Sequence, residues 1–305
     1  MLLRTNKNRL KARIFPWRLA VWPCCLSLII ALHASPTWAT TVLKLTQSDH
    51  PLDAYAINAL KVALKQLDEP FELEAYPEQL TADRALDRLR SGAIDVFWQA
   101  TSKEKEQEYH PIRFPIMKGL LGLRVCIIHR DNQARFNNIV KLADLATVSL
   151  GQGRNWTDTS ILTANGLEVV KVTKYRSLFH MVDGGRFDGF PRGILEAWVE
   201  VMDNKDLDLA VEKSLLLAYK MPFYLYVTKT NALLGDKIKE GLDRALENGD
   251  FDRFFYAEEM VKTGLSLSNF RNRNVIYLDN PTLPAETPLD NEAYWFDVEN
   301  DVLPL

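Results

Sequence analysis

Segments with strand character alternate with helical segments along the chain, and this alternation limits the fold more than any other feature of the sequence. Residues 42–46 alternate apolar and polar side chains, as a half-buried strand does. The elements that we expect next are a helix over 53–67, a strand over 71–76, a helix over 81–90 and a buried strand over 93–98. Strands that alternate with helices predict a mainly parallel sheet with helices on its faces.

A second alternation follows the long apolar strand that we expect over 120–129. Its expected elements are a helix over 138–145, a strand over 147–150, a helix over 157–165, a strand over 168–173, a helix over 177–184, a strand over 187–190 and a helix over 194–203. A strand over 223–229, an amphipathic helix over 236–248 and a strand over 274–278 complete the pattern. Two α/β units joined by extended segments near 126–131 and 221–228 predict two lobes, a hinge and a cleft.

The first 39 residues have the pattern of a signal peptide. A basic stretch precedes the apolar run 19–32, and small residues precede the cleavage that we expect after Ala39. The apolar run is shorter than the roughly 20 residues of a membrane-spanning helix. Export to the periplasm of a Gram-negative bacterium is therefore predicted, with an uncleaved anchor as the alternative. Lipidation at Cys24 is disfavoured because the rigid Pro23 precedes it.

The charge of the remaining chain is acidic. Six of the 37 basic residues and none of the 40 acidic ones lie in residues 1–39, which leaves 31 basic against 40 acidic residues and a net charge of −9. This sign argues against nucleic acid and anionic membranes as partners. Cys126 is then the only cysteine, so no intramolecular disulfide is expected, and its apolar surroundings predict a buried thiol.

Sequence patterns of known catalytic sites are missing. The chain has no G-x-S-x-G, no H-E-x-x-H, no phosphate-binding loop and no paired-cysteine metal spacing. The histidines lack ligand spacing. We therefore expect neither an enzyme, nor a cofactor, nor a metal site.

Five stretches of the chain together resemble the family 3 solute-binding proteins, the periplasmic amino-acid-binding type. They are RLRSGAIDVFWQATS (88–102), FPIMKGLLGLRV (114–125), GQGRNWTDTSIL (151–162), MVDGGRFDGFPRG (181–193) and FYLYVTKTN (223–231), and they stand in the family's order. The resemblance implies the α/β, two-lobed periplasmic binding protein type II fold, with a mainly parallel sheet flanked by helices in each lobe. It implies a first lobe from 40–127 and 223–262, a second lobe from 128–222 and a C-terminal strap over 263–305.

The resemblance also places the ligand-binding segments. They are the loop after the first strand, the segment after Trp98, the helix start at Trp156 and the strand end after Asp188. All four lie at strand carboxyl ends or a helix N-terminus, where open α/β sheets bind ligands. The residues expected to contact the ligand are Asp49, Trp98, Gln99, Thr101, Ser102, Arg124, Gln152, Trp156, Thr157 and Arg192. Core packing of Trp98 and helix capping by Thr157 are the alternatives.

Two positions depart from the family pattern. A carboxylate-binding arginine is expected a few residues beyond Trp98, where this chain has only Lys103 and Lys105, and a lysine cannot form a planar bidentate pair. An ammonium-binding aspartate is often found where this chain has Arg192. Both departures favour an anionic ligand, held by Arg124 or Arg192, over an ordinary α-amino acid; surface positions are the alternative for both arginines.

The function that these observations favour is binding of a small polar, anionic solute by a monomer. The resemblance implies delivery of the solute to the permease of an ABC importer or to a membrane sensor, a kinase or cyclase. A periplasmic enzyme on the same fold, similar to dehydratases, is the alternative. It would need an acid or base such as Glu196, Asp188 or His50, although Asp188 is expected to close a turn instead.

Overall fold

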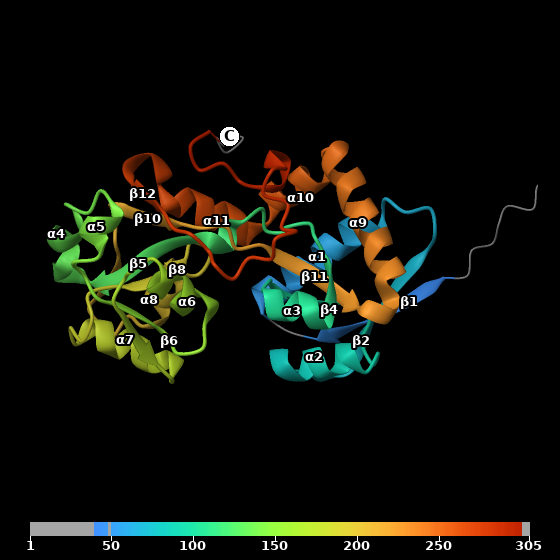
Figure 1. Cartoon of the computed structure of the whole chain (residues 1–305), viewed down its shortest axis with the longest axis horizontal. Helices are drawn as coiled ribbons and strands as arrows, with labels where there is room; N and C mark the ends of the chain where they lie inside the picture. Colours follow the sequence, from blue (N-terminus) through green and yellow to red (C-terminus); the bar gives the residue numbers. More distant parts are fainter. Residues whose placement is uncertain (1–39, 48–49, 301–305) are drawn as a thin grey trace, which may run out of the picture. The chain divides into compact units, whose positions relative to one another are not determined.

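The computed structural model describes residues 40–47 and 50–300. The predicted signal peptide and Asp49 lie outside these residues. Within them the chain is a mixed α/β protein whose sheets are flanked by helices, as predicted (Figure 1). The helices are α1 (Pro51–Leu64), α2 (Ala82–Arg90), α3 (Lys103–Glu108), α4 (Gln133–Phe136), α5 (Leu142–Leu145), α6 (Thr157–Ala164), α7 (Tyr175–Asp183), α8 (Ala197–Asp203), α9 (Ala232–Glu247), α10 (Asp250–Ala257) and α11 (Glu259–Ser268).

The first predicted alternation is present and carries a buried core. Strand β1 (Thr41–Gln47) pairs with β2 (Phe71–Gln79), and Leu45 forms a bridge to Val96, just before β3 (Phe97–Ala100). The apolar side of α1 packs against α9, which lies beside it in Figure 1. Strand β11 (Phe223–Thr228) lies between β3 and β4 (Tyr109–Ile112).

Strand β5 (Leu123–His129) is the centre of the second group of strands. It pairs with β8 (Phe190–Gly193), β9 (Leu209–Val211) and β10 (Leu215–Ala218), and β10 continues the sheet to β12 (Asn274–Tyr277). Alternate residues of β5 enter two different cores. Val125 and Ile127 belong to the core that also contains Trp98, and Cys126 and Ile128 belong to a second core that contains Leu150. Cys126 is buried as expected, and this burial raises the pKa of its thiol, which keeps it protonated.

Parallel and antiparallel pairing both occur. Parallel pairing is present between β1 and β2, between β6 (Leu150–Gly153) and β7 (Val169–Val172), and between β10 and β12. Five further pairs are antiparallel, and each of them includes β5 or β11. Strand β5 overlaps the first extended connection predicted from the sequence, 126–131, and β11 lies within the second, 221–228.

Several boundaries differ from the sequence-based expectation. Only the last four residues of the helix expected over 138–145 are helical, as α5, while α4 ends before that range begins. Six elements were not predicted: α3, β4, β9, β10, α10 and α11. Helix α3 buries none of its residues, so its sequence KEKEQE carries no apolar period to detect.

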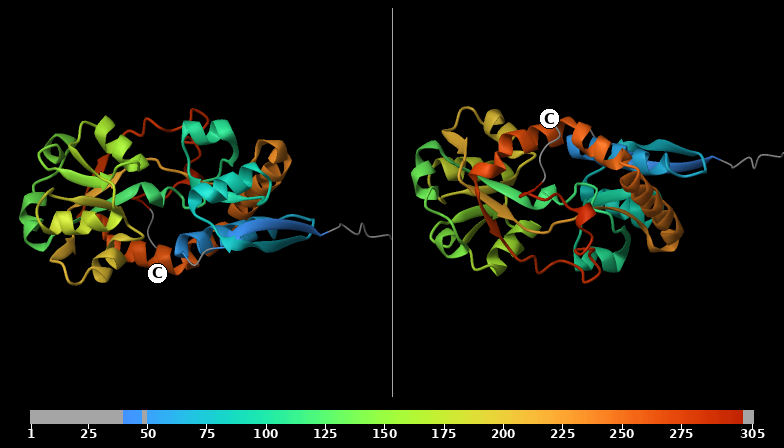
Figure 2. Two further views of the ribbon diagram at one scale, coloured as in Figure 1. Left: turned by 90° about the horizontal axis from the view of Figure 1, so that it is seen from below. Right: turned by 90° about the horizontal axis from the view of Figure 1, so that it is seen from above.

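The C-terminal segment returns to the sheet and then crosses the start of β5. After β12 has paired with β10, the backbone N–H of Phe296 donates to the carbonyl of Lys118 at 2.8 Å. Figure 2 shows this segment, coloured red, from two further sides. In the part of the chain that the structure describes, every helix is too short or too polar to cross a membrane.

Candidate functional site

Strands β6 and β8 run parallel and in contact, so their carboxyl ends lie on the same side, and a helix begins shortly after each of them. The N–H of Gly151 donates to the carbonyl of Gly189 at 2.8 Å, and the bridge between Leu150 and Gly189 is parallel. The chain then enters α6 at Thr157 and α8 at Ala197. Adjacent carboxyl ends of parallel strands are where ligands bind in open α/β sheets.

Arg124 projects from β5 into a buried group of polar side chains. Its Nη2 lies 2.7 Å from Oδ1 of Asp158, its Nη1 lies 3.3 Å from Oε1 of Glu196, and its Nε donates to the hydroxyl of Tyr219 at 3.0 Å. The Tyr219 hydroxyl in turn donates to Asp158. Burial by itself would lower the pKa of Arg124, but attraction by Asp158 and the other anionic partners raises it above its ordinary value.

Arg192 projects from β8 into an aromatic and acidic environment. Its Nε and Nη2 form a bidentate pair with Glu200 at 2.7 and 2.6 Å, and Nη2 lies 2.9 Å from Glu196. Burial would lower its pKa, but Glu196 and Glu200 raise it. The guanidinium carbon lies 5.0 Å from the ring centre of Trp156, 5.1 Å from that of Phe190 and 5.6 Å from that of Tyr175. These distances are those of cation–π contacts.

These side chains form one network with more negative than positive groups. We call Arg124, Asp158, Arg192, Glu196 and Glu200 the arginine–carboxylate cluster; its two guanidinium groups and three carboxylates give a formal charge of −1. Four of the five side chains are about nine-tenths buried, whereas the side chain of Glu196 is 41% exposed. Glu196 is therefore the member that can leave the cluster without a large rearrangement.

Gln152 is a residue of β6 whose side chain reaches β8 next to Arg192. It is fully buried, and its Nε2 donates to the carbonyl of Pro191 at 3.0 Å. Its Oε1 has no hydrogen-bond partner among the described residues. Trp156 is the N-cap residue of α6 and Thr157 the first residue of that helix. The structure thus brings Arg124, Gln152, Trp156, Thr157 and Arg192 of the expected ligand residues into one region.

Trp98 lies in the core of the first group of strands. It is 2% exposed, and its indole N–H donates to Oδ1 of Asp53, in the first turn of α1, at 2.5 Å. The indole ring of Trp98 is therefore packed in the core, which was the alternative to ligand contact. Its N–H is already bound to Asp53.

Replacing Asp53 with alanine is expected to lower the free energy of unfolding by about 1–3 kcal/mol, because a buried indole N–H is left without an acceptor. Asp53→Asn is the matched control, since it keeps an acceptor and removes the same charge from the first turn of α1. Urea unfolding of the three proteins measures the difference. Equal destabilisation by the two variants would mean that the hydrogen bond contributes nothing.

Of the other expected ligand residues near Trp98, Thr101 and Ser102 have partners within their own segment. Thr101 donates to Glu106 at 2.8 Å, and Ser102 caps α3 by accepting from the N–H of Lys105 at 3.4 Å. Gln99 keeps one buried atom, Nε2, without a partner among the described residues. The two lysines proposed as substitutes for the family's arginine bind backbone carbonyls, Lys103 that of Pro281 at 3.0 Å and Lys105 that of Ala100 at 2.7 Å.

The residues named for the alternative enzyme function also have partners. Asp188 accepts from the N–H of Ser149 at 2.8 Å and pairs with Arg135 at 2.7 Å, which are the contacts of a residue that closes a turn. His50 caps α1 by accepting from the N–H of Leu52 at 3.2 Å. Glu196 is held by the two cluster arginines.

Sequence reasoning missed Glu200 and Tyr219. Glu196 and Glu200 follow Arg192 by four and eight residues, but Arg192 lies in β8 and α8 begins only at Ala197, so no helical spacing connects them. Tyr219 follows the short strand β10, which was itself not predicted, and no sequence pattern connects it to Asp158.

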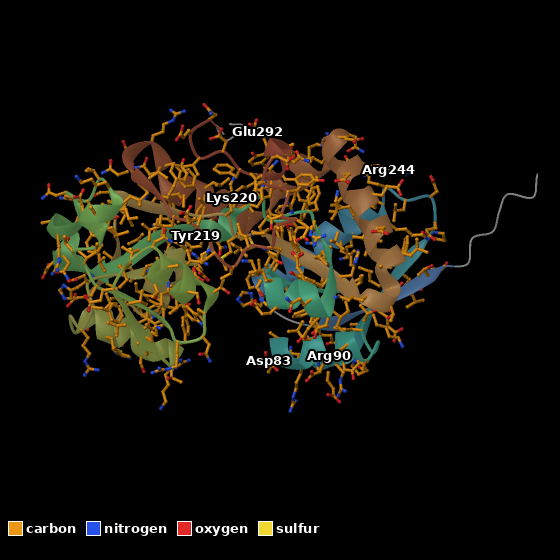
Figure 3. All side chains as sticks on the ribbon, in the orientation of Figure 1. Asp83, Arg90, Tyr219, Lys220, Arg244 and Glu292 are labelled. Atoms are coloured by element: carbon orange, nitrogen blue, oxygen red, sulfur yellow. The ribbon has the colours of Figure 1, made fainter. Side chains whose placement is uncertain are left out.

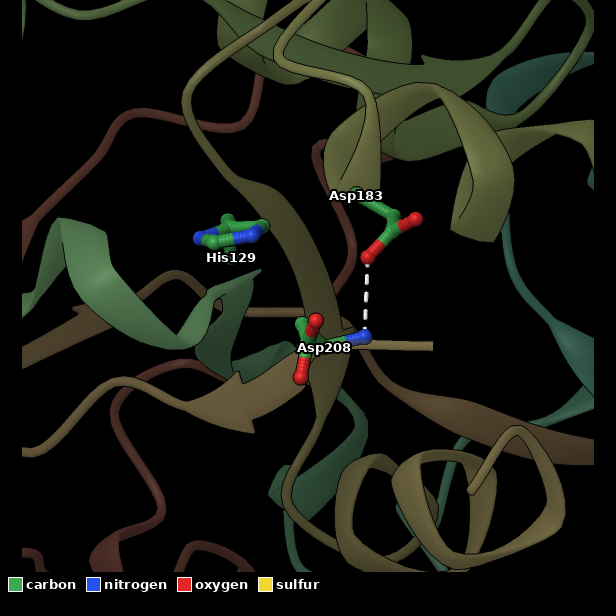
Figure 4. A group of neighbouring side chains, drawn as sticks. All are labelled: His129, Asp183 and Asp208. Carbon is green, nitrogen blue, oxygen red and sulfur yellow. Dashed lines mark hydrogen bonds between the residues drawn. The ribbon is translucent and has the colours of Figure 1, made fainter. Parts of the chain in front are cut away.

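A group of possible metal ligands lies at the far end of β5. His129, Asp183 and Asp208 bring one ligand atom each within 4.8 Å of one another (Figure 4). However, Nδ1 of His129 accepts from the N–H of Asp131 at 3.3 Å, and Asp183 accepts from the N–H of Asp208 at 2.8 Å. One nitrogen of His129 and one carboxylate oxygen of Asp183 are thus already bound to backbone N–H groups. The group is best explained as a junction between β5, α7 and β9.

A cavity of about 500 Å³ lies where the C-terminal segment crosses the start of β5. Tyr219, Lys220 and Glu292, labelled in Figure 3, are among the residues that line it. The ammonium of Lys220 lies 4.4 Å from the ring centre of Trp295, which also lines the cavity, and burial lowers the pKa of this lysine. The ring of Tyr219 thus borders the cavity while its hydroxyl belongs to the network of the cluster.

Comparison with known proteins gives likeness to solved structures only. No protein-family model matches the sequence, and no curated protein does. An ancestral arginine-binding protein bound to arginine is 18% identical, with 72% of this chain and 98% of that chain covered and a TM-score of 0.49. The second substrate-binding domain of GlnP from Lactococcus lactis, in an open conformation, is 14% identical, with 73% and 97% covered and a TM-score of 0.48.

A histidine kinase sensor domain with similarity to periplasmic binding proteins is 14% identical over 73% of this chain and 96% of that chain, with a TM-score of 0.48. Amino-acid-binding proteins of ABC transporters are also among the matches. These are proteins of the kind that the five sequence stretches resemble.

Proposed function

We propose that the protein binds a small polar solute that carries a carboxylate, and that Arg124 and Arg192 receive this carboxylate. The observation that carries the proposal is the pair of buried guanidinium groups at the carboxyl end of β8, with a half-exposed carboxylate between them. Arginine is the side chain best suited to bind a carboxylate in a buried place, because its donors are fixed and its charge is permanent.

Two buried amide atoms without a partner, one in each of the proposed lobes, also support a bound ligand. Oε1 of Gln152 and Nε2 of Gln99 are buried without a partner among the described residues. A buried polar atom without a partner is unfavourable by about 1–3 kcal/mol, and a bound ligand is one way to supply the missing hydrogen bond. One atom is an acceptor and the other a donor, which suits a polar solute.

We propose further that the solute is held between two lobes, 40–127 with 223–262 and 128–222, while 263–305 forms a strap. Closure would then be driven by contacts that only the closed state makes. Delivery to an ABC importer or a membrane sensor by a periplasmic monomer follows from the family resemblance. The stretches just before the two connecting segments are hydrogen-bonded to each other, since the N–H of Tyr219 donates to the carbonyl of Gly122 at 3.1 Å, and this supports a common hinge.

The test is a thermal-shift screen of the exported protein, followed by calorimetry of the compounds that stabilise it. The panel compares dicarboxylates, zwitterionic amino acids, cationic amino acids and short peptides, after bound solutes have been removed by unfolding and refolding. Compounds with a free carboxylate should raise the melting temperature in proportion to the logarithm of their concentration. Stabilisation by amines without a carboxylate, or by no compound, would contradict the proposal.

A further inference from the structure

Glu196 occupies the position that a ligand carboxylate needs. One of its oxygens, Oε1, lies 3.3 Å from Nη1 of Arg124 and accepts the N–H of Gly193 at 2.9 Å. The other, Oε2, lies 2.9 Å from Nη2 of Arg192. Three donors on two strands thus converge on one carboxylate, which belongs to the protein itself.

The other two carboxylates of the cluster have different surroundings. Asp158 is buried and bound by Arg124 and Tyr219, and Glu200 is buried and bound by Arg192 and Tyr175. Each arginine therefore keeps one buried anionic partner when Glu196 is left out. The cluster without Glu196 has two guanidinium groups and two carboxylates, so it is neutral, and its remaining donors face the position that Glu196 leaves.

The local backbone is shaped to keep this position open. A Cβ atom on Gly193 would lie 2.9 Å from Nη1 of Arg124 and 3.0 Å from Oε1 of Glu196. Glu196 itself is the N-cap residue of α8, but its side chain makes no capping hydrogen bond to that helix. The carboxylate of Glu196 therefore does not stabilise the start of α8. It can turn toward solvent without the loss of a capping hydrogen bond.

We infer that Glu196 is a built-in competitor: its carboxylate fills the seat formed by Arg124, Arg192 and the N–H of Gly193, and an anionic solute must displace it to bind. This inference rests on the proposed function, because that function says which ligand Glu196 competes with, namely a solute that carries a carboxylate. With Glu196 in place the cluster has a charge of −1 and repels an anion; with Glu196 displaced it is neutral and offers three donors. An anion therefore binds only if its contacts with the two arginines are stronger than those of Glu196, and weakly binding anions are excluded.

The test uses sodium acetate as a substitute for the missing carboxylate. In the full-length exported protein, Glu196→Ala empties the seat, and acetate should then raise the melting temperature in a saturable manner. At ten times its dissociation constant, acetate favours the folded state about tenfold. Wild-type protein and Glu196→Gln, in which a side chain still fills the seat, should respond to acetate no more than to sodium chloride at equal ionic strength.

An equal effect of acetate on all three proteins, or no effect on Glu196→Ala, would overturn the inference. Glu196→Ser is the second variant if the alanine protein does not fold, because a serine hydroxyl can accept the N–H of Gly193 but is too short to reach both arginines. Binding of ¹³C-labelled acetate, followed by its NMR line width, gives a readout that is independent of stability.

The two proposals fail in different ways. If acetate rescues Glu196→Ala but no solute of the panel stabilises the wild type, the seat is established and the proposed function is wrong. If a carboxylate solute binds the wild type and Glu196→Ala binds it no more tightly, the function stands and the inference about Glu196 is wrong. Tighter binding by Glu196→Ala, tenfold or more, supports both.

Discussion

Replacing Arg124 with methionine is expected to lower the free energy of unfolding by about 3–5 kcal/mol, because it leaves buried charge without its partner. Asp158 loses the guanidinium 2.7 Å away, and the Tyr219 hydroxyl loses one of its two partners. Methionine keeps much of the apolar volume of the arginine stem, so cavity formation adds little to the effect. The loss is to be measured by urea unfolding at constant pH and salt.

Arg90→Met is the matched control, on the exposed face of α2 where Arg90 is labelled in Figure 3. Arg90 also pairs with two carboxylates, Asp87 at 2.7 Å and Glu108 at 2.9 Å, but its side chain is 57% exposed. Surface pairs are screened by water and contribute little. The contrast therefore separates burial from the number of ion pairs. Similar losses in the two variants would show that the arginine–carboxylate cluster is open to solvent.

The alternation of apolar segments was enough to predict the class of the fold. The run Val125 to Ile128 shows why, since consecutive residues of β5 enter opposite cores and only a strand buried on both faces tolerates such a run. Short elements without a period, such as α3 and β10, were not predictable in this way. Their positions depend on contacts with distant segments, as β10 depends on β5 and β12.

The candidate site was predictable only in part, because its arginines are paired with carboxylates of the protein itself. The sequence identified Arg124 and Arg192 as possible cleft arginines, but it could not show that both are neutralised by the protein's own carboxylates. The pair of Arg192 with Glu200 lies within one short segment, but it joins a strand to a helix and has no recognisable spacing. The pair of Arg124 with Asp158 joins β5 to α6, and no local pattern encodes such a contact.

The neutralisation of Arg192 changes what its presence means for the ligand. An arginine at this place, instead of the family's aspartate, suggests an anionic ligand if it stands free. In this protein the guanidinium group of Arg192 is already in contact with three aromatic rings and forms a bidentate pair with the carboxylate of Glu200. A ligand would therefore meet an arginine whose charge is already balanced, so the number of charges on the arginines is a poor guide to the charge of the solute. The exposed fraction of their carboxylate partners is the better guide.

Replacing Gly122 with alanine is expected to be at least as damaging as the loss of Arg124, with a decrease of about 3 kcal/mol or more in the free energy of unfolding. Gly122 lies where the segment before β5 passes the segment after β10, and a Cβ atom there would lie 1.7 Å from the backbone oxygen of Tyr219. A backbone atom cannot move aside as a side chain can, so the two segments must separate. This shift carries the Tyr219 hydroxyl away from Arg124 and Asp158.

The same variant therefore tests whether the crossing and the cluster act as one unit. Any solute that binds the wild type should bind Gly122→Ala more weakly than the loss of stability alone explains, because Tyr219 no longer holds the cluster. Gly184→Ala is the control, since the nearest atom to its Cβ is the carbonyl oxygen of His180 at 3.2 Å and a compatible Gly→Ala change alters stability by only about 0.4–1 kcal/mol. Urea unfolding and calorimetry of both variants give the two quantities. Unchanged solute affinity in a destabilised but folded Gly122→Ala protein would show that the cluster keeps its geometry without the crossing.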